Sequence, residues 1–251
     1  MGNTGGRPRG FPGGWAALCF LGCFVAGQGM FLLLGPDRQA SFLAFASTNV
    51  ANLTHEPVGC LAASAFVTGG DVLSTLTWLP LIAIALAGAV RAVGTWRTVA
   101  VAAAGHVVGT LVSEGALSWR IWTGARPDGF RYLTDVGPSY VVVSALTLAI
   151  LALPWSRRDR GAWTWRSLTV AAMLVLIFPG QIFSGLFRLD VAAVGHVTAI
   201  AVALLAAPLV RRRALSPPRA ANLPRSSRSR RRRSFQWLAG RRATCAPDRT
   251  S

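Results

Sequence analysis

The sequence predicts an all-α membrane protein: a bundle of six transmembrane helices followed by a disordered basic tail. Of its 251 residues, 52% are hydrophobic and only 14% are charged, whereas soluble domains are about 25% charged. Six apolar runs have about the length needed to cross ~30 Å of hydrocarbon. All 26 basic residues are Arg, and 13 of them follow residue 210. The strong positive charge therefore belongs mostly to the tail.

The first run, residues 15–34, has 20 residues and no charge. Residues 1–14, before it, are Gly-rich and are expected to be disordered. A signal peptide cleaved near residues 26–28 is an alternative reading of this run. Because the apolar residues continue through Leu34, we favour a retained first helix.

Residues 35–57 form a polar-leaning loop in this reading, with residues 41–46 apolar enough to lie at the membrane interface. A short interfacial helix is predicted over residues 58–67. The second and third spans follow at residues 72–90 and 98–119.

A loop with mixed charge, residues 120–134, precedes the fourth span at residues 137–155. The fifth span is predicted over residues 167–187, with a kink at Pro179-Gly180 because proline removes a helical hydrogen bond. The sixth span covers residues 191–210.

The arginines also predict orientation. Cytoplasmic segments carry an excess of basic residues, and here the turns at residues 91–97 and 157–166 and the two termini together hold 21 Arg, against five in the other loops. We therefore expect both termini in the cytoplasm and residues 120–134 outside. The exclusive use of Arg, with the Ala, Val, Leu and Gly bias, is typical of a GC-rich bacterial gene and predicts a bacterial plasma membrane.

The tail, residues 211–251, has too little apolar surface to form a core. Its Arg clusters favour contact with anionic lipid headgroups. A nucleic-acid or protein partner, or no role at all, are the alternatives, and the membrane anchor makes nucleic acid the weaker one. Four cysteines give neither a disulfide framework nor a zinc spacing, so we expect no metal and no cofactor.

Three ionisable residues lie inside predicted spans: His106, Glu114 and His196. Each costs about 2.5–3.5 kcal/mol to insert and so requires a reason. At 1.5 Å per residue, Glu114, Ser139 and His196 come to roughly 6–9 Å below the outer boundary. His106 lies nearer the midplane, and small residues beside it favour a structural role. Glu114 either has a structural partner or orients a histidine.

Ser139 is well placed for chemistry. Pro138 suits the first turn of a helix, where backbone N–H groups have no intrahelical partner. The N–H groups around Gly137, Ser139 and Tyr140 could therefore stabilise an oxyanion. His196 is the histidine at matching depth, and a serine needs such a base to act as a nucleophile.

These residues resemble the motifs of the rhomboid family of intramembrane serine proteases, and most closely its divergent actinobacterial relatives. Gly137 to Tyr140 stand where rhomboids carry Gly-x-Ser-Gly, and residues 195–199 stand where they carry Ala-His-x-x-Gly. Residues 64–66 and 94–98 also look like the family. The likeness covers residues 15–210. It implies that Ser139 is the nucleophile, that His196 is its base, and that the substrate is a transmembrane protein.

The chain departs from the family in two places. Tyr140 replaces the second Gly of the serine motif, where a substrate backbone would approach. The second span lacks the His and Asn that help rhomboid proteases to hold the oxyanion, and Thr75 or Thr77 would be a weak substitute. Two hypotheses follow: an intramembrane serine protease, or an inactive relative that binds transmembrane segments of other proteins. Small-molecule transport is a distant third.

Overall fold

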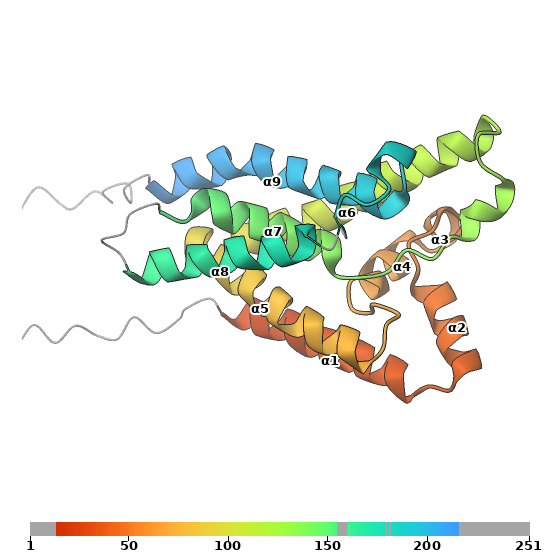
Figure 1. Ribbon diagram of the computed structural model, residues 1–251, viewed down its shortest axis with the longest axis horizontal. Helices are drawn as coiled ribbons and strands as arrows, with labels where there is room; N and C mark the ends of the chain where they lie inside the picture. Colours follow the sequence, from red (N-terminus) through yellow and green to blue (C-terminus); the bar gives the residue numbers. More distant parts are fainter. Residues whose placement is uncertain (1–13, 155–159, 179, 181, 216–251) are drawn as a thin grey trace, which may run out of the picture. The chain divides into compact units, whose positions relative to one another are not determined.

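The computed structural model describes residues 14–154, 160–178, 180 and 182–215 (Figure 1). Within these residues the chain contains helices and no strand. The helices are α1 (Trp15–Leu33), α2 (Pro36–Ala46), α3 (Val50–His55), α4 (Pro57–Ser64), α5 (Val72–Val93), α6 (Thr95–Trp122), η1 (Asp128–Tyr132), α7 (Ser139–Ala152), α8 (Arg160–Ile177), η2 (Leu186–Arg188) and α9 (Val191–Leu215).

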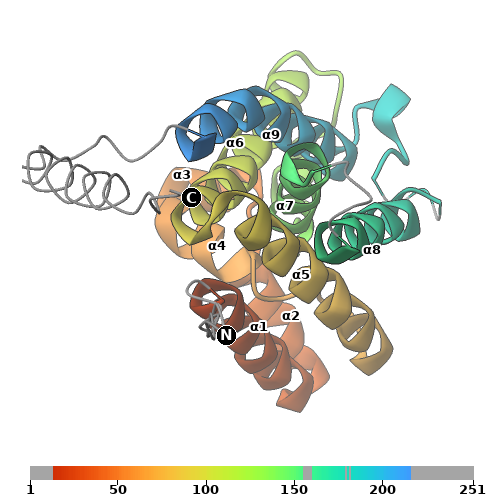
Figure 2. The ribbon, with the colours of Figure 1, turned by 90° about the vertical axis from the view of Figure 1, so that its left-hand side faces the viewer.

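Helix α7 is the central helix of the bundle. It packs against α5, α6 and α8, and Figure 2 shows it enclosed by these three helices and α9. Every residue from Tyr140 to Ala149 is buried. A helix with neighbours on all sides must be apolar all round, which explains why its sequence shows no polar face.

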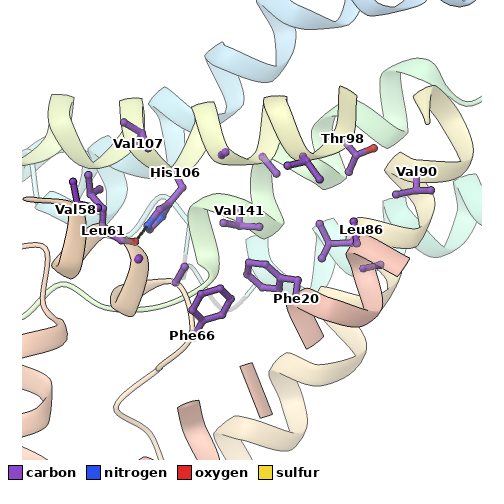
Figure 3. Close-up of a pocket in the computed structure, with 17 residues that line it drawn as sticks. Phe20, Val58, Leu61, Phe66, Leu86, Val90, Thr98, His106, Val107 and Val141 are labelled. Atoms are coloured by element: carbon purple, nitrogen blue, oxygen red, sulfur yellow. Dashed lines mark hydrogen bonds between the residues drawn. The ribbon is translucent and has the colours of Figure 1, made fainter. Parts of the chain in front are cut away.

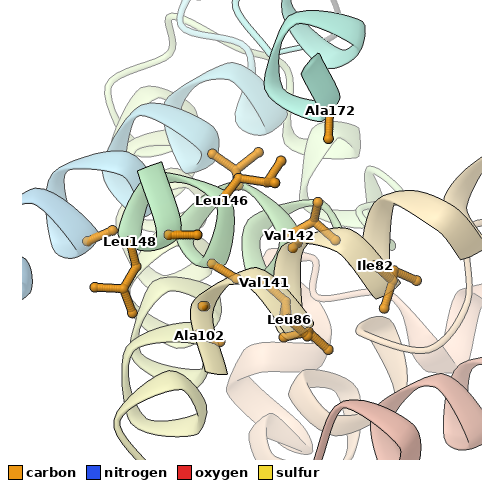
Figure 4. Packing of buried hydrophobic residues seen from close by; sticks show 14 of the residues in the cluster. Ile82, Leu86, Ala102, Val141, Val142, Leu146, Leu148 and Ala172 are labelled. Carbon is orange, nitrogen blue, oxygen red and sulfur yellow. The ribbon is translucent and has the colours of Figure 1, made fainter. Parts of the chain in front are cut away.

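The core forms where α5, α6 and α8 meet α7 (Figure 4). Val142 and Leu146 of α7 are fully buried, as is Ile82 of α5. Small residues let the helices approach closely: a Cβ on Gly88 of α5 would lie 2.6 Å from Thr169 of α8. The outward faces carry many exposed large hydrophobic residues, as expected for helices that face lipid.

Four of the described helices are long and apolar enough to cross a membrane: α1, α5, α6 and the part of α9 up to Val210. All four coincide with predicted spans. The fourth predicted span corresponds to α7, which is apolar but has only 14 residues. The fifth corresponds to α8, which has 18 residues but is not among the helices that are both long and apolar enough to cross a membrane.

Three expectations about element boundaries were wrong. The predicted loop at residues 35–57 contains α2 and α3. The fifth helix runs from Arg160 to Ile177 instead of over residues 167–187, so most of the predicted turn at residues 157–166 is helical, and turns with η2 follow Ile177. Helix α9 continues to Leu215, into the segment assigned to the tail. The predicted interfacial helix at residues 58–67 is present as α4, one residue earlier at its start.

The expected disorder of residues 1–13 and 216–251 lies outside the described residues, as does Pro179.

Polar contacts anchor the segment between α1 and α5. The buried amide of Gln28 on α1 donates to the carbonyl of Gly70 at 2.9 Å and accepts from the N–H of Thr68 at 2.9 Å. Asn52 donates to the carbonyls of Ala44 and Ser47. These bonds give α2, α3 and α4 a defined place beside the bundle although none of the three helices is long.

Candidate active site

Ser139 is the first residue of α7, and its side chain is partly buried. Gly137 has φ of 138°, and its N–H donates to the carbonyl of Ser64 at 2.8 Å. The chain therefore enters α7 through a glycine that is tied to the end of α4, and the Gly137 N–H, expected as an oxyanion donor, is already bonded to Ser64. Ser139 begins the helix at a place where the first N–H groups have no helical acceptor.

His196 lies near the start of α9 and is 5% exposed. Its Nδ1 is 3.1 Å from the carbonyl of Ile182, so Nδ1 carries the proton and donates it. In the neutral ring this leaves the lone pair on Nε2. Nε2 is buried and has no hydrogen-bond partner in the described part of the chain, so no hydrogen bond joins it to Ser139.

Tyr140 brings α7 and His196 into contact. Its ring meets the His196 ring edge-on, with 5.2 Å between centroids. A Cβ added to Gly195 would overlap the Tyr140 ring, and a Cβ added to Gly109 would lie 3.4 Å from it. The glycines of α6 and α9 therefore make room for an aromatic side chain between the helices. Tyr140 points inward and is only 3% exposed.

Asp135 holds Tyr140 and was not anticipated as a site residue. The Tyr140 hydroxyl donates to Asp135 Oδ2 at 3.2 Å, and the Thr48 hydroxyl is 3.4 Å from the same oxygen. The Asp135 carbonyl accepts from the Thr48 N–H at 2.9 Å, and the Asp135 N–H donates to Ser47 at 2.9 Å. Asp135 thus ties the chain before Ser139 to the segment between α2 and α3. Its position just before an apolar run was the available signal.

Burial raises the pKa of the Asp135 carboxyl from 3.8 to about 6, although the hydrogen bonds from Tyr140 and Thr48 act in the opposite direction. Both bonds favour the ionised form, but they do not replace the hydration lost on burial.

Glu114 is 2% exposed, and neither carboxyl oxygen has a partner at full hydrogen-bond geometry among the described residues, although the main-chain N–H of Val50 interacts with its carboxyl group. It lies within electrostatic range of Asp135. The alternative in which Glu114 orients the proposed base receives no support from hydrogen bonding, because the partner of His196 Nδ1 is the carbonyl of Ile182. Because every residue has a main-chain carbonyl, the sequence could not predict that the carbonyl of Ile182 is the partner of His196.

His106 ties α6 to α4. Its Nε2 is 2.9 Å from the carbonyl of Leu61 and 3.3 Å from the Ser64 hydroxyl. The structural role of His106 remains a prediction, and these contacts place the ring where α4 and α6 meet. A cavity of about 480 Å³ lies beside His106, with almost entirely apolar walls from α1, α4 and the residues after it, α5, α6 and α7 (Figure 3). Neither Ser139 nor His196 lines it.

Thr77 was the candidate oxyanion donor on the second span. Its hydroxyl donates to the carbonyl of Leu73 in its own helix at 2.9 Å, and its side chain is exposed. It lines a hollow shared with Val175 and Leu176 of α8. No contact brings Thr77 to Ser139. Among the described residues, no group of three or more His, Cys, Asp or Glu is placed to hold a metal ion.

Comparison with protein families identifies the chain. The model of a family described as rhomboid-like protein matches residues 9–216, a range that includes all the described helices. The chain belongs to the rhomboid-like protein family. No curated protein and no solved structure matches it. Family and apolar helices together establish a rhomboid-like membrane protein that resides in a lipid bilayer.

Proposed function

We propose that this rhomboid-like protein is an intramembrane serine protease that cleaves a transmembrane substrate near the outer face of a bacterial plasma membrane. In this proposal six helices span the bilayer and both termini are cytoplasmic. The observation that carries it is the state of His196: the carbonyl of Ile182 holds the proton on Nδ1, and the buried Nε2 has no partner. A base must present such a free lone pair to a nucleophile.

Each step would use groups of this chain. His196 Nε2 takes the Ser139 proton while Oγ attacks the scissile carbonyl carbon. The N–H groups of the first turn of α7 stabilise the oxyanion. His196 then gives the proton to the leaving amine as the C–N bond breaks. Water hydrolyses the acyl ester by the same route and restores Ser139.

Tyr140 would hold the base in place. Its ring contacts His196, and its hydroxyl is fixed by Asp135. Because the ring is anchored at both ends, His196 has little freedom to rotate away. In this proposal Ser139 and His196 come into hydrogen-bond contact when substrate binds, since no hydrogen bond joins them in its absence.

The second candidate function is that of an inactive relative that binds transmembrane segments. It is favoured by the absence of a hydrogen bond between Ser139 and His196 and by the position of Thr77, which leaves the oxyanion without a side-chain donor from α5. Loss of such a donor costs about 100–1000-fold in rate. A protease that cleaves slowly would also be consistent with the missing Ser139–His196 hydrogen bond and the missing side-chain donor.

The deciding experiment is labelling of membranes with a fluorophosphonate probe, combined with cleavage of single-span test substrates. Ser139→Ala and His196→Ala should each abolish cleavage to a similar extent, because members of one catalytic unit are not additive. Glu114→Gln should have a milder effect. Ser144→Ala is the matched control, since the Ser144 hydroxyl is buried and bonded to the Tyr140 carbonyl of its own helix at 2.8 Å. Equal activity of wild type and Ser139→Ala would exclude the protease.

A further inference from the structure

A hollow of about 430 Å³ lies where the end of α6 meets the start of α9. Figure 1 shows these two helices side by side. Three arginines from three segments line the hollow, and one carboxylate accompanies them: Arg120, Arg126, Arg188 and Asp190. The rest of the wall is apolar and comes from Leu117, Phe130, Leu133, Leu189 and Val191. The hollow is therefore built of guanidinium groups against a hydrophobic background.

Contacts of the arginines give the hollow its shape. Arg120 Nη1 donates to the carbonyls of Arg188 and Leu189 at 2.9 and 3.1 Å, which ties η2 to α6. The guanidinium of Arg126 lies 5.0 Å from the Phe130 ring centroid and 3.7 Å from Asp190. Asp190 thus offsets one of the three positive charges. Two remain, and the Arg188 side chain is exposed.

The hollow adjoins the proposed catalytic pair. Val191 lines it, and the Val191 carbonyl is 3.4 Å from the Tyr140 hydroxyl. Tyr140 in turn contacts His196. Leu133, on another wall, is two residues before Asp135. A peptide bound with its scissile bond at Ser139 would have its flanking residues near this hollow.

We propose that this arginine-lined hollow receives acidic side chains from the segment of a substrate that lies just outside the membrane. The inference rests on the proposed function and names the class of substrate: single transmembrane segments with Asp or Glu at their outer end. Guanidinium groups bind carboxylates with paired hydrogen bonds, and the apolar wall accommodates the methylene groups of the same peptide. A lipid headgroup would supply anionic charge too, but it would occupy the place where the scissile segment must lie.

The test compares three single-span substrates that differ only in an acidic, neutral or basic outer flank, in vesicles of zwitterionic lipid. We expect KM for the acidic substrate to be roughly fivefold lower than for the neutral one, the size of one or two partly exposed ion pairs, with kcat unchanged. The difference should shrink at high ionic strength, since salt screens exposed charges.

Charge reversal makes the test specific. Arg188→Glu should abolish the preference for the acidic flank and improve KM for the basic one. Arg38→Glu is the matched control, because Arg38 is an exposed arginine on α2 away from the hollow, and it should keep the wild-type order. An unchanged order in Arg188→Glu would overturn the inference. A parallel series of vesicles with increasing phosphatidylglycerol tests the lipid alternative, and a KM that follows this content and ignores the flank would also overturn the inference.

The two proposals fail in different ways. Ser139→Ala decides whether cleavage belongs to this protein, and the order of KM values decides the role of the hollow. The affinity of Ser139→Ala for the three substrates, measured by photo-crosslinking, tests the hollow without cleavage. A preference for the acidic flank in that variant supports the inference, and equal affinities overturn it.

Discussion

Tyr140 is the residue on which the two histidine-bearing helices converge. It contacts His196 on α9, its centroid is 6.2 Å from that of His106 on α6, and it is anchored to Asp135. Such a position demands glycine on the facing helices, and α9 supplies Gly195 there. The Tyr140 ring fits between the helices only because position 195 has no side chain.

Gly195→Ala should therefore be destabilising by about 1–3 kcal/mol, the usual cost of overpacking, because a Cβ there would overlap the Tyr140 ring. Gly115→Ala is the control: it lies in α6 with nothing within 4 Å of its Cβ position, so it should be neutral or stabilising by ~0.5–1 kcal/mol. Thermal unfolding in detergent measures both. A Gly195→Ala variant as stable as Gly115→Ala would contradict the packing.

Asp135 predicts how stability depends on pH. Its folded-state pKa is raised from 3.8 to about 6, so the folded protein favours the protonated carboxyl. That contribution is fully present below about pH 3.8 and is lost as the pH rises through about 6, at most about 3 kcal/mol in total.

Asp135→Asn should flatten this part of the profile of unfolding temperature against pH. Asp128→Asn, at a carboxylate that is 72% exposed and paired with Arg131, should leave the profile unchanged. Glu114 and Tyr140 face Asp135 and are intact in both variants, so the comparison isolates Asp135. Parallel profiles for wild type and Asp135→Asn would refute the assignment.

Helix α7 has a different status from the other helices. With 14 residues it is shorter than the other bundle helices. Because neighbouring helices surround it, its ends can lie against protein and need not reach the two membrane surfaces. At its end, the buried Arg166 of α8 donates to the carbonyl of Leu153 at 2.6 Å. This bond ties the C-terminal end of α7 to α8.

The order of helices predicts the accessibility of the turns. Single cysteines at the exposed positions Arg91, Gly94, Arg160 and Gly161 should react with membrane-impermeant reagents only from the cytoplasmic side, and cysteines at exposed positions of residues 120–134 only from outside. The reason is the Arg asymmetry between these turns. Intact and inside-out vesicles provide the comparison. Labelling of a cysteine at Arg160 or Gly161 from outside would reverse the predicted direction of the helices. It would then also contradict the prediction that Ser139 and His196 lie at the same depth in the membrane.

At the scale of the whole molecule, the described helices account for the fold. Removing residues 216–251 should leave a membrane-inserted, protease-resistant core, because this segment has little apolar surface and the basic residues 211–213 remain to anchor α9. Limited proteolysis of membranes expressing the full chain and the truncated chain checks this. Loss of the resistant core on truncation would show that the tail is structural.

The sequence by itself determined the family, the membrane setting and the positions of α1, α5, α6 and α9. Apolar runs of about 20 residues have few alternatives to a membrane helix, so their bounds were predictable to within a few residues. The short helices α2 and α3 were not, because local composition there is polar and their stability comes from contacts such as those of Asn52.

Only the tertiary structure decided what surrounds the candidate residues. It assigned the Ile182 carbonyl to His196, turned Tyr140 inward, placed Asp135 beneath it and separated Thr77 from Ser139. These outcomes depend on how helices are rotated and spaced, and main-chain carbonyls or a glycine opposite an aromatic ring carry no sequence pattern of their own. Depth along a helix follows from counting residues, whereas the partner across an interface is set by packing.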